Sequence, residues 1–404
     1  MRKLSGFFAF TLSLGLATSL ATAAVASPAK PPVDRQAIAE KLVRQCAGIQ
    51  ENDLVMVSGG TNEMELLEDI AVSVRRVGAF PLLTVGTDRL VRHMYDDVPA
   101  TYDAQTPLLG LKLAGILSAS ITVDFGDDPA LLAHVPPARM AARSIAGQPV
   151  SDLYYSRSIR QVNLGNGLDP TASLAMQFAI PLADLEKLFW DGVNVDYARL
   201  QATGQTVAKL LEGGQELRIT NPNGTDLRMK VNARPVLVSD GVISAEDVQK
   251  GGVACQVWLP AGEVYLTPVP GTAEGRLVVD HNFYQDQELV GLTLEIAGGR
   301  VTGMTAKSGL QAFKARYDAA GTGKDAVSVL DLGINPNVTI PPGSKMTAYM
   351  PSGMVSLNLG NNIWAGGENR SDFGFTFFIP GSTLTVDGRS LVEKGRLEAS
   401  LLSK

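Results

Sequence analysis

The spacing of apolar residues in the first half of the chain predicts helices that alternate with short strands. Residues 36–47 and 63–77 carry apolar side chains at helical spacing. The short apolar runs that predict buried strands lie at 53–58, 80–85, 121–125 and 161–164. Strand, helix and strand joined by short links indicate a parallel sheet packed against helices. The first half therefore predicts an α/β domain.

In the second half the apolar residues change from helical spacing to alternation, in which every second residue is apolar. Helical spacing continues over 180–211, and then two runs of alternating residues flank the turn Asn221-Pro222-Asn223-Gly224-Thr225. Asn-Gly tolerates positive φ, so this segment predicts a β-hairpin. The later runs that predict strands lie at 263–269, 276–280, 292–296, 300–305, 346–350 and 375–379. We place a domain boundary near residue 212, with an α/β domain at 33–211 and a β-rich domain at 212–404.

The N-terminus has the features of a signal peptide. Arg2 and Lys3 precede an apolar core at 7–20, and the small residues at 24–26 form a cleavage site. A membrane anchor is the alternative, but the core is short for a span, which needs ~20 apolar residues. We expect a signal peptide at 1–26 and an extended leader at 27–32. The mature protein is then secreted or periplasmic, with no membrane attachment.

Composition and charge narrow the classes of partner. The 404-residue chain is 45% hydrophobic and 19% charged, as in ordinary globular proteins, with a formal charge of −6. An acidic chain disfavours binding to nucleic acid or to an anionic membrane, since both select basic surfaces. Cys46 and Cys255 lie far apart and are expected to be buried free thiols, and two cysteines exclude a multi-cysteine zinc site.

Three segments of the second half are rich in turn residues and polar residues. They are Leu-Pro-Ala-Gly-Glu-Val at 259–264, followed by Pro-Gly-Thr-Ala-Glu-Gly at 270–275, then Asp-Leu-Gly-Ile-Asn-Pro-Asn at 331–337, and 353–371, where Gly-x-Val-x4-Gly-Asn-Asn leads into Gly-Gly-x-Asn-x-Ser. Glu263 follows a Pro-Ala-Gly turn at the start of a strand, so its backbone is rigid. A carboxylate in that position suits a metal ligand or a general base.

Together with Val386-Asp387-Gly388, the Pro-Asn-Gly-Thr-Asp-Leu hairpin and residues 169–197, these segments resemble the thermophilic metallo-aminopeptidases of the aminopeptidase T and aminopeptidase S type. The resemblance extends over most of the mature chain. It implies an α/β N-terminal domain, a β-rich (α+β) catalytic domain of the aminopeptidase T fold, and a homodimer. It also implies two divalent metal ions (zinc, cobalt or manganese) about 4 Å apart, which activate the water that attacks the first peptide bond.

The resemblance assigns site positions residue by residue. It places one metal-ligating and catalytic carboxylate on Glu263 and a second metal ligand on Asp331, where the family usually has glutamate. Four further family positions are two histidines, an aspartate and a tyrosine, and in this chain they fall on Ser356, Gly374, Thr376 and Ile363.

Histidine is scarce, and this limits the possible replacements for the missing ligands. His93 and His134 lie in the first half, where we expect surface or packing roles. His281 lies in the β-rich half and is a candidate substitute metal ligand. Ser356, Asn358 and Asn369 are neutral and suit the binding of a polar ligand, although asparagine also serves tight turns.

Three hypotheses for function remain open. The first is a divergent metal-dependent exopeptidase that removes N-terminal residues from peptides. The second is a non-catalytic relative that binds a peptide or small polar ligand without metal, and the third is a mononuclear metal enzyme of another reaction type, such as the ring-cleaving dioxygenases that share this fold family. The sequence has no Gly-x-Ser-x-Gly elbow, no His-Glu-x-x-His helix and no phosphate loop.

Overall fold

The computed structural model describes residues 34–402, so the predicted signal peptide and leader lie outside the described residues. Residues 35–404 form one compact unit. Among the described residues, no helix combines the length and the apolar character that crossing a bilayer requires.

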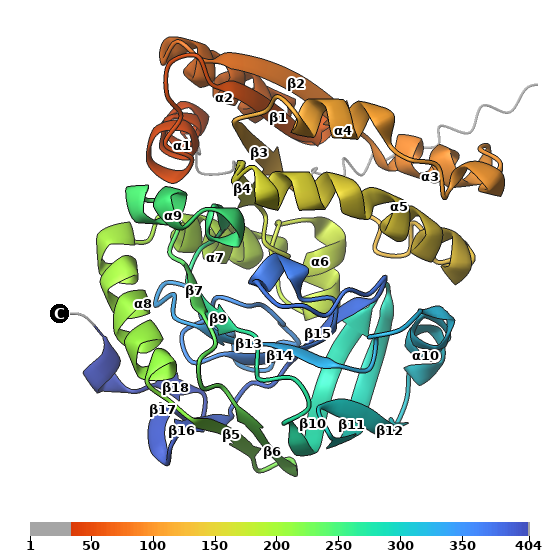
Figure 1. Ribbon diagram of the computed structural model, residues 1–404, viewed down its shortest axis with the longest axis vertical. Helices are drawn as coiled ribbons and strands as arrows, with labels where there is room; N and C mark the ends of the chain where they lie inside the picture. Colours follow the sequence, from red (N-terminus) through yellow and green to blue (C-terminus); the bar gives the residue numbers. More distant parts are fainter. Residues whose placement is uncertain (1–33, 403–404) are drawn as a thin grey trace, which may run out of the picture. The chain divides into compact units, whose positions relative to one another are not determined.

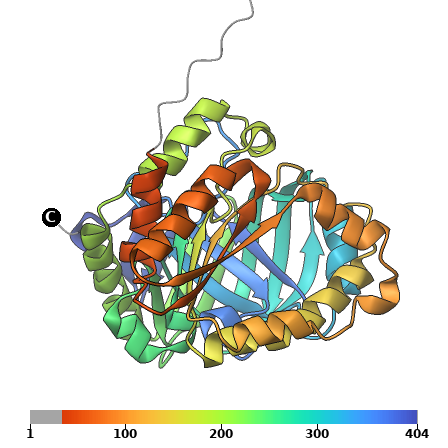
Figure 2. The same cartoon turned by 90° about the horizontal axis from the view of Figure 1, so that it is seen from above.

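Sheet A is a parallel sheet with the strand order β2-β1-β3-β4-β8. Its strands are β1 Leu54–Gly60, β2 Phe80–Gly86, β3 Ala119–Val123, β4 Arg160–Leu164 and β8 Gln256–Leu259. Helices α1 (Arg35–Glu40) and α2 (Met64–Arg76) pack together, and α2 packs against β1 and β2 (Figures 1 and 2). Leu66, Leu67, Ile70 and Val74 of α2 are buried, which is the apolar stripe that the sequence predicts.

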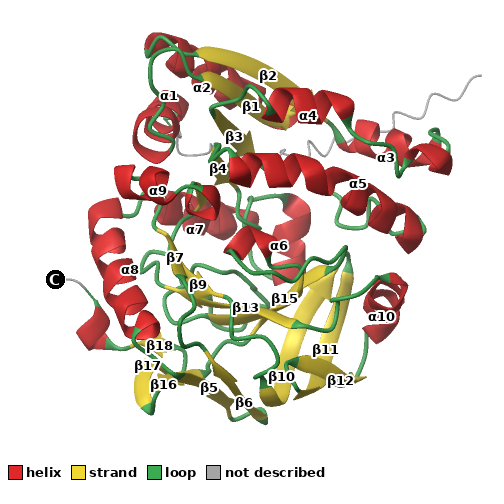
Figure 3. Ribbon diagram, in the orientation of Figure 1, coloured by secondary structure: helices red, strands yellow, loops and turns green. Residues whose placement is uncertain are grey.

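Two antiparallel sheets follow (Figure 3). Sheet B has the order β12-β11-β10-β6-β5-β16-β17-β18. Its strands are β5 Glu216–Asn221, β6 Thr225–Lys230, β10 Glu274–Tyr284, β11 Gln287–Ala297, β12 Arg300–Thr305, β16 Thr383–Val386, β17 Arg389–Glu393 and β18 Arg396–Leu397. Sheet C has the order β15-β14-β13-β9-β7. Its strands are β7 Val236–Ser239, β9 Glu263–Leu266, β13 Val327–Gly333, β14 Val355–Gly360 and β15 Gly374–Phe378.

The remaining α-helices connect these sheets and cover them. They are α3 Asp88–Asp96, α4 Leu108–Ala114, α5 Pro137–Ser156, α6 Ala172–Phe178, α7 Leu182–Val193, α8 Tyr197–Glu212, α9 Ala245–Lys250 and α10 Leu310–Ala319. Helix α8 packs against β7 and β9 of sheet C. Helix α9 begins with a capping box between Ser244 and Asp247, which satisfies backbone N–H groups of its first turn.

Most of the predicted elements are confirmed. The hairpin at 221–225 joins β5 to β6, with Gly224 at φ +107° and Asn223 Oδ1 accepting the Thr225 N–H at 3.1 Å. Cys46 and Cys255 are buried free thiols. The division into domains stays a prediction: residue 212 ends α8, and β8 from the second half completes sheet A.

The strand predicted at 346–350 is wrong. These residues form no strand, and the whole connection from β13 to β14 is loop (Figure 3). Its backbone crosses over Gly333, where an added Cβ would lie 2.4 Å from the Tyr349 carbonyl oxygen. The segment therefore packs across the end of β13 instead of pairing along a strand.

Asp240, which follows β7, supplies a test of how burial affects stability. Its side chain is 6% exposed, and burial raises its pKa to about 6 from the ordinary 3.8. A raised folded-state pKa means that the folded protein holds the proton more tightly than the unfolded chain. The resulting stability is present below pH 4 and is lost as pH rises through about 6.

We expect Asp240→Asn to raise the free energy of unfolding above that of the wild type at pH 7 by up to about 3 kcal/mol. The difference should vanish near pH 4, because asparagine keeps an acceptor for the Val242 N–H, which Asp240 binds at 3.1 Å. Urea denaturation at both pH values measures this. Exposed Asp286, changed to Asn, is the control; a variant less stable than the wild type at pH 7 contradicts the prediction.

Candidate functional site

Glu263 and Asp331 lie on the same face of sheet C. In the antiparallel pairing of β9 with β13, Glu263 is opposite Gly333 and Tyr265 is opposite Asp331. Alternate residues of a strand share a face, and so do residues directly opposite each other. The two carboxylates are therefore diagonal neighbours, with Cβ atoms roughly 7 Å apart.

The next two strands extend this face with neutral polar side chains. Ser356 on β14 is directly opposite Asp331, and Asn358 follows two residues later. Thr376 on β15 is opposite Asn358. The structure therefore brings Glu263, Asp331, Ser356 and Asn358 together on one face and adds Thr376 to them.

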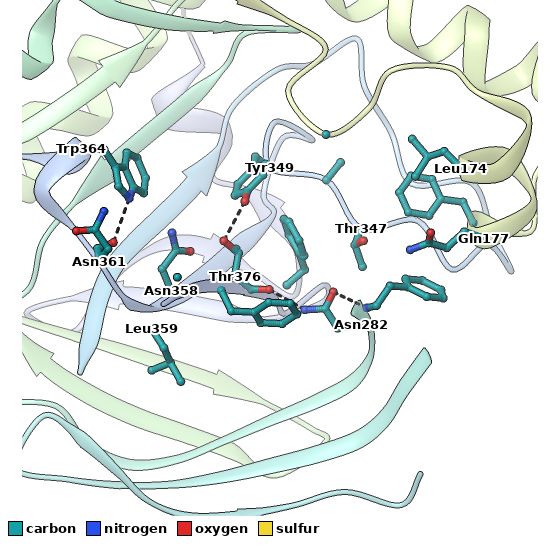
Figure 4. Close-up of a pocket in the computed structure, with 17 residues that line it drawn as sticks. Leu174, Gln177, Asn282, Thr347, Tyr349, Asn358, Leu359, Asn361, Trp364 and Thr376 are labelled. Atoms are coloured by element: carbon teal, nitrogen blue, oxygen red, sulfur yellow. Dashed lines mark hydrogen bonds between the residues drawn. The ribbon is translucent and has the colours of Figure 1, made fainter. Parts of the chain in front are cut away.

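Tyr349 is part of the site although the sequence analysis did not select it. Its hydroxyl lies 2.9 Å from the Thr376 hydroxyl (Figure 4). Burial first, and then the charges of Glu263 and Asp331, raise the pKa of Tyr349 to about 12, against a lowering effect of the Thr376 hydrogen bond. The phenol is thus close enough to both carboxylates to respond to their charge. It lies in an irregular segment, where spacing gives no signal.

Asn166 connects sheet A to Glu263. Its side-chain amide donates to Glu263 Oε1 and to the Pro260 carbonyl at 3.1 Å. Its own N–H donates to Asn163 Oδ1 at 3.0 Å, and the Asn163 amide donates to Asp124 Oδ1 at 2.6 Å. The sequence signal that could have identified Asn166 is the Gly-Asn-Gly turn after the predicted strand at 161–164. Ligands of parallel sheets bind at the carboxyl ends of the strands, which is where this turn lies.

Burial governs the electrostatics of the two carboxylates. Glu263 is 4% exposed and Asp331 is 3% exposed. Burial raises the pKa of Glu263 to about 7, against a lowering effect of the Asn166 hydrogen bond. Burial first, and then the charge of Glu263, raise the pKa of Asp331. Buried oxygens with no hydrogen-bond partner lie beside the pair, namely Asp331 Oδ1, Ser356 Oγ and Asn358 Oδ1.

An aromatic cluster closes one side of the carboxylate pair. Tyr265, opposite Asp331, packs against Trp258 and Trp364 with ring centroids 5.8 and 5.5 Å away. Trp258 and Trp364 pack edge to face at 5.7 Å. This apolar contact excludes water from one flank of the carboxylates and contributes to their raised pKa values.

A cavity of about 480 Å³ adjoins this polar face at Asn358 and Thr376 (Figure 4), and Trp364 of the aromatic cluster is part of its lining, whereas neither carboxylate is. Its polar lining includes Tyr349, Asn358 and Thr376, together with Asn282, whose amide donates to the Thr376 carbonyl at 2.7 Å. Its apolar lining includes Leu174, Phe178, Phe283, Leu359, Phe375 and Phe378. The cavity therefore has the size and the mixed lining of a small-molecule site.

Two predicted site residues do not join this face. The Asn369 amide donates to the carbonyls of Gly323 and Gly360, at 2.8 and 2.6 Å, so it fixes a loop. His281 is on β10 of sheet B instead of sheet C, and it is not part of the cavity lining. In residues 34–402 no group of three or more histidine, cysteine, aspartate or glutamate side chains is arranged to hold a metal ion.

Similarity to known proteins agrees with this architecture. A family model described as thermophilic metalloprotease (M29) matches residues 34–321. The chain belongs to this M29 family. It is aminopeptidase-like in sequence and fold, as the resemblance implied. The matched region contains Glu263 and ends before β13, which carries Asp331.

Solved structures show the same fold as this M29 member. Wild-type AmpT from Thermus thermophilus is 16% identical with a TM-score of 0.70, covering 90% of this chain and 98% of that one. A 2,5-dihydroxypyridine dioxygenase from Pseudomonas putida KT2440 is 15% identical with a TM-score of 0.58, covering 91% of this chain and 99% of that one. At these identities the likeness establishes the fold alone. No curated protein sequence matches the chain.

Asn335 holds the turn from which Glu263 emerges. Its side chain is fully buried, and its amide donates to the carbonyls of Ala261 at 2.6 Å and Gly192 at 3.1 Å. Its Oδ1 accepts the Asn337 N–H at 2.9 Å. The amide thus ties α7, the turn before β9 and the end of β13 together.

We expect Asn335→Ala to lower the free energy of unfolding by about 2–4 kcal/mol, because it leaves buried carbonyl groups unpaired. Urea denaturation measures the change. Asn337→Ala is the matched control, since that side chain is exposed and should cost less than about 1 kcal/mol. Equal stability of the two variants would contradict the role given to Asn335.

Proposed function

We propose that this M29-family protein binds a small ligand that carries an ammonium group, such as the N-terminus of a peptide, and does not hydrolyse it. The observation that carries this proposal is the group of buried, unpartnered oxygens beside two buried carboxylates. The proposal retains the family's peptide-like ligand and assigns a different role to the carboxylates.

The chemistry of these oxygens calls for a donor that carries positive charge. Asn358 Oδ1 is an acceptor only, Asp331 Oδ1 is an acceptor when its carboxyl group is ionised, and the Ser356 hydroxyl can accept as well. Burying an acceptor without a donor costs free energy, and so does burying two neighbouring carboxylates without a countercharge. An ammonium group supplies three N–H donors and one positive charge, which satisfies both requirements.

The cavity suits the remainder of such a ligand. Asn358 and Thr376 are part of both the polar face and the cavity lining, so an ammonium held by the face leaves its side chain in the cavity. The phenylalanine and leucine side chains there favour an apolar group. We therefore infer a ligand whose first residue is apolar, as in leucine or phenylalanine.

The residues present do not fit the metal pair that the resemblance implies. Zinc-type centres use histidine or cysteine together with carboxylates. Here the family's two histidine positions are Ser356 and Gly374, its aspartate position is Thr376, and its tyrosine position is Ile363. Two carboxylates and neutral oxygens are weak ligands for zinc, which histidine or cysteine usually helps to hold. We infer that the active site has diverged from a metal centre.

A second candidate function is the metal-dependent exopeptidase, which the family match favours. Glu263 and Asp331 would then hold the divalent metal, which would supply the activated water. Glu263 would also be the general base. A mononuclear centre of another reaction type is the third reading and would require a further ligand beside the pair.

Localisation and assembly extend the proposal. The positively charged start, apolar core and small residues of 1–26 support export to the periplasm or the medium, with cleavage after Ala26. The resemblance to the aminopeptidase T type supports a homodimer.

The ligand prediction concerns the charge on the amine. We expect L-leucinamide to bind the mature protein at least about tenfold more tightly than N-acetyl-L-leucinamide, since acetylation removes the ammonium charge. Asp331→Asn should weaken leucinamide binding by about tenfold or more, and exposed Asp286→Asn should not. Isothermal titration calorimetry measures the affinities. Equal binding of the amine and its acetylated form rules out ammonium recognition.

The metal prediction separates the two candidate functions. After dialysis against zinc, cobalt or manganese and then metal-free buffer, we expect less than half an equivalent of metal by plasma mass spectrometry. We also expect no release of the chromophore from leucine p-nitroanilide. Two retained equivalents, with hydrolysis that Glu263→Gln abolishes, would establish the exopeptidase and refute the binding function.

A further inference from the structure

One face of sheet A is polar, which is unusual for a parallel sheet. Such sheets are normally buried on both faces, and their strands are apolar throughout. Here polar and apolar residues alternate along β3, β4 and β8, and the register aligns the polar ones. One row across the three strands is Ser120, Gln161 and Gln256. The next row on the same face is Thr122, Asn163 and Trp258.

The opposite face has the apolar residues expected of a core. Ile121 and Val162 are buried there, and α2 covers this face. Leu67 of α2 and Val123 of β3 both lie within 3.3 Å of a Cβ placed on Gly59. The apolar residues thus form the core on this face, and the polar residues of the other face are not part of it.

A second cavity, of about 410 Å³, lies over the polar face. It shares Gly167 and Tyr349 with the cavity beside the carboxylates, so the two cavities meet at these residues. Gln161 is part of this lining, and its Nε2 atom is buried with no hydrogen-bond partner among residues 34–402. An unpaired amide donor on a side chain that lines a cavity of this size can turn toward a ligand that accepts its hydrogen bond.

We propose that this second cavity receives the residue that follows the ammonium-bearing one, and that it selects an uncharged polar side chain such as that of asparagine or glutamine. The inference rests on the proposed binding function and adds the class of the second residue. The ligand is then a peptide with an apolar first residue and a carboxamide at the second.

The lining excludes the other classes of side chain. It contains no lysine, arginine or histidine that could bind an anion. Its one acid, Asp124, already accepts from the Asn163 side chain, and backbone N–H groups of Asn166 and Gly167 also hydrogen-bond to it, so it is not free for a cation. An apolar side chain would leave the Gln161 donor unpaired and displace water from the amides around it. A carboxamide offers both an acceptor and donors.

The test compares leucinamide, leucyl-asparaginamide and leucyl-leucinamide by isothermal titration calorimetry. We expect the wild type to bind leucyl-asparaginamide about tenfold more tightly than leucyl-leucinamide. Gln161→Leu, of similar volume, should abolish that preference. Exposed Gln249→Leu is the matched control and should keep it. Equal affinity of the wild type for the two dipeptide amides, or a preference that survives in Gln161→Leu, overturns the inference.

A second variant covers the case in which Gln161→Leu disturbs folding. Gly167 has φ +68°, and a Cβ there would meet nothing within 4 Å, so Gly167→Asn is compatible with the fold. We expect it to narrow the junction of the cavities and to weaken both dipeptide amides at least about fivefold relative to leucinamide. Unchanged relative affinities would contradict a ligand that passes this junction. Failure of leucinamide to bind the wild type would instead refute the proposed function itself.

Discussion

The burial of Glu263 and Asp331 on one face of sheet C is the constraint on which the rest of the site depends. The backbone pairing of β9 with β13 fixes both side chains, and an aromatic cluster around Tyr265 closes one flank. Neither carboxylate forms an ion pair with a lysine, arginine or histidine of residues 34–402. A folded protein keeps such an arrangement only if protonation or a bound cation offsets the cost of burying charge. The raised pKa values describe the first state, and the proposed ammonium ligand produces the second.

The sequence predicted those parts of the site that regular strands carry. Glu263 was recognised from the turn before its strand and Asp331 from the family resemblance, and the pairing of neighbouring antiparallel strands of sheet C brings them together with Ser356. Local patterns also predicted the hairpin at 221–225, because Asn-Gly restricts the turn geometry. These features depend on residues close in sequence or on motifs that fix the backbone.

The parts that the sequence did not predict depend on contacts between distant segments. Tyr349 reaches the site from a loop whose path is set by packing across Gly333, so no periodicity marks it. Asn166 acts through a hydrogen bond to a residue 97 positions away. The polar alternation in β3 and β4 was visible in Ser-Ile-Thr-Val-Asp and Gln-Val-Asn-Leu, but both runs were interpreted only as buried strands. Alternation in a parallel sheet was the signal that one face lines a cavity.

The two cavities differ in chemistry because different sheets supply their polar groups. Sheet C supplies negative charge beside one cavity, while sheet A supplies neutral donors and acceptors to the other. Gly167 and Tyr349 line both cavities, and Asn166 links the two sheets through its hydrogen bond to Glu263. A fold shared with AmpT and with a dioxygenase does not select among reactions, because activity resides in the side chains at the site. In this chain the strands keep two carboxylates in place and present hydroxyl, amide and glycine positions around them. Those groups can accept hydrogen bonds from a cation such as an ammonium, and this is the physical argument for the peptide ligand proposed above.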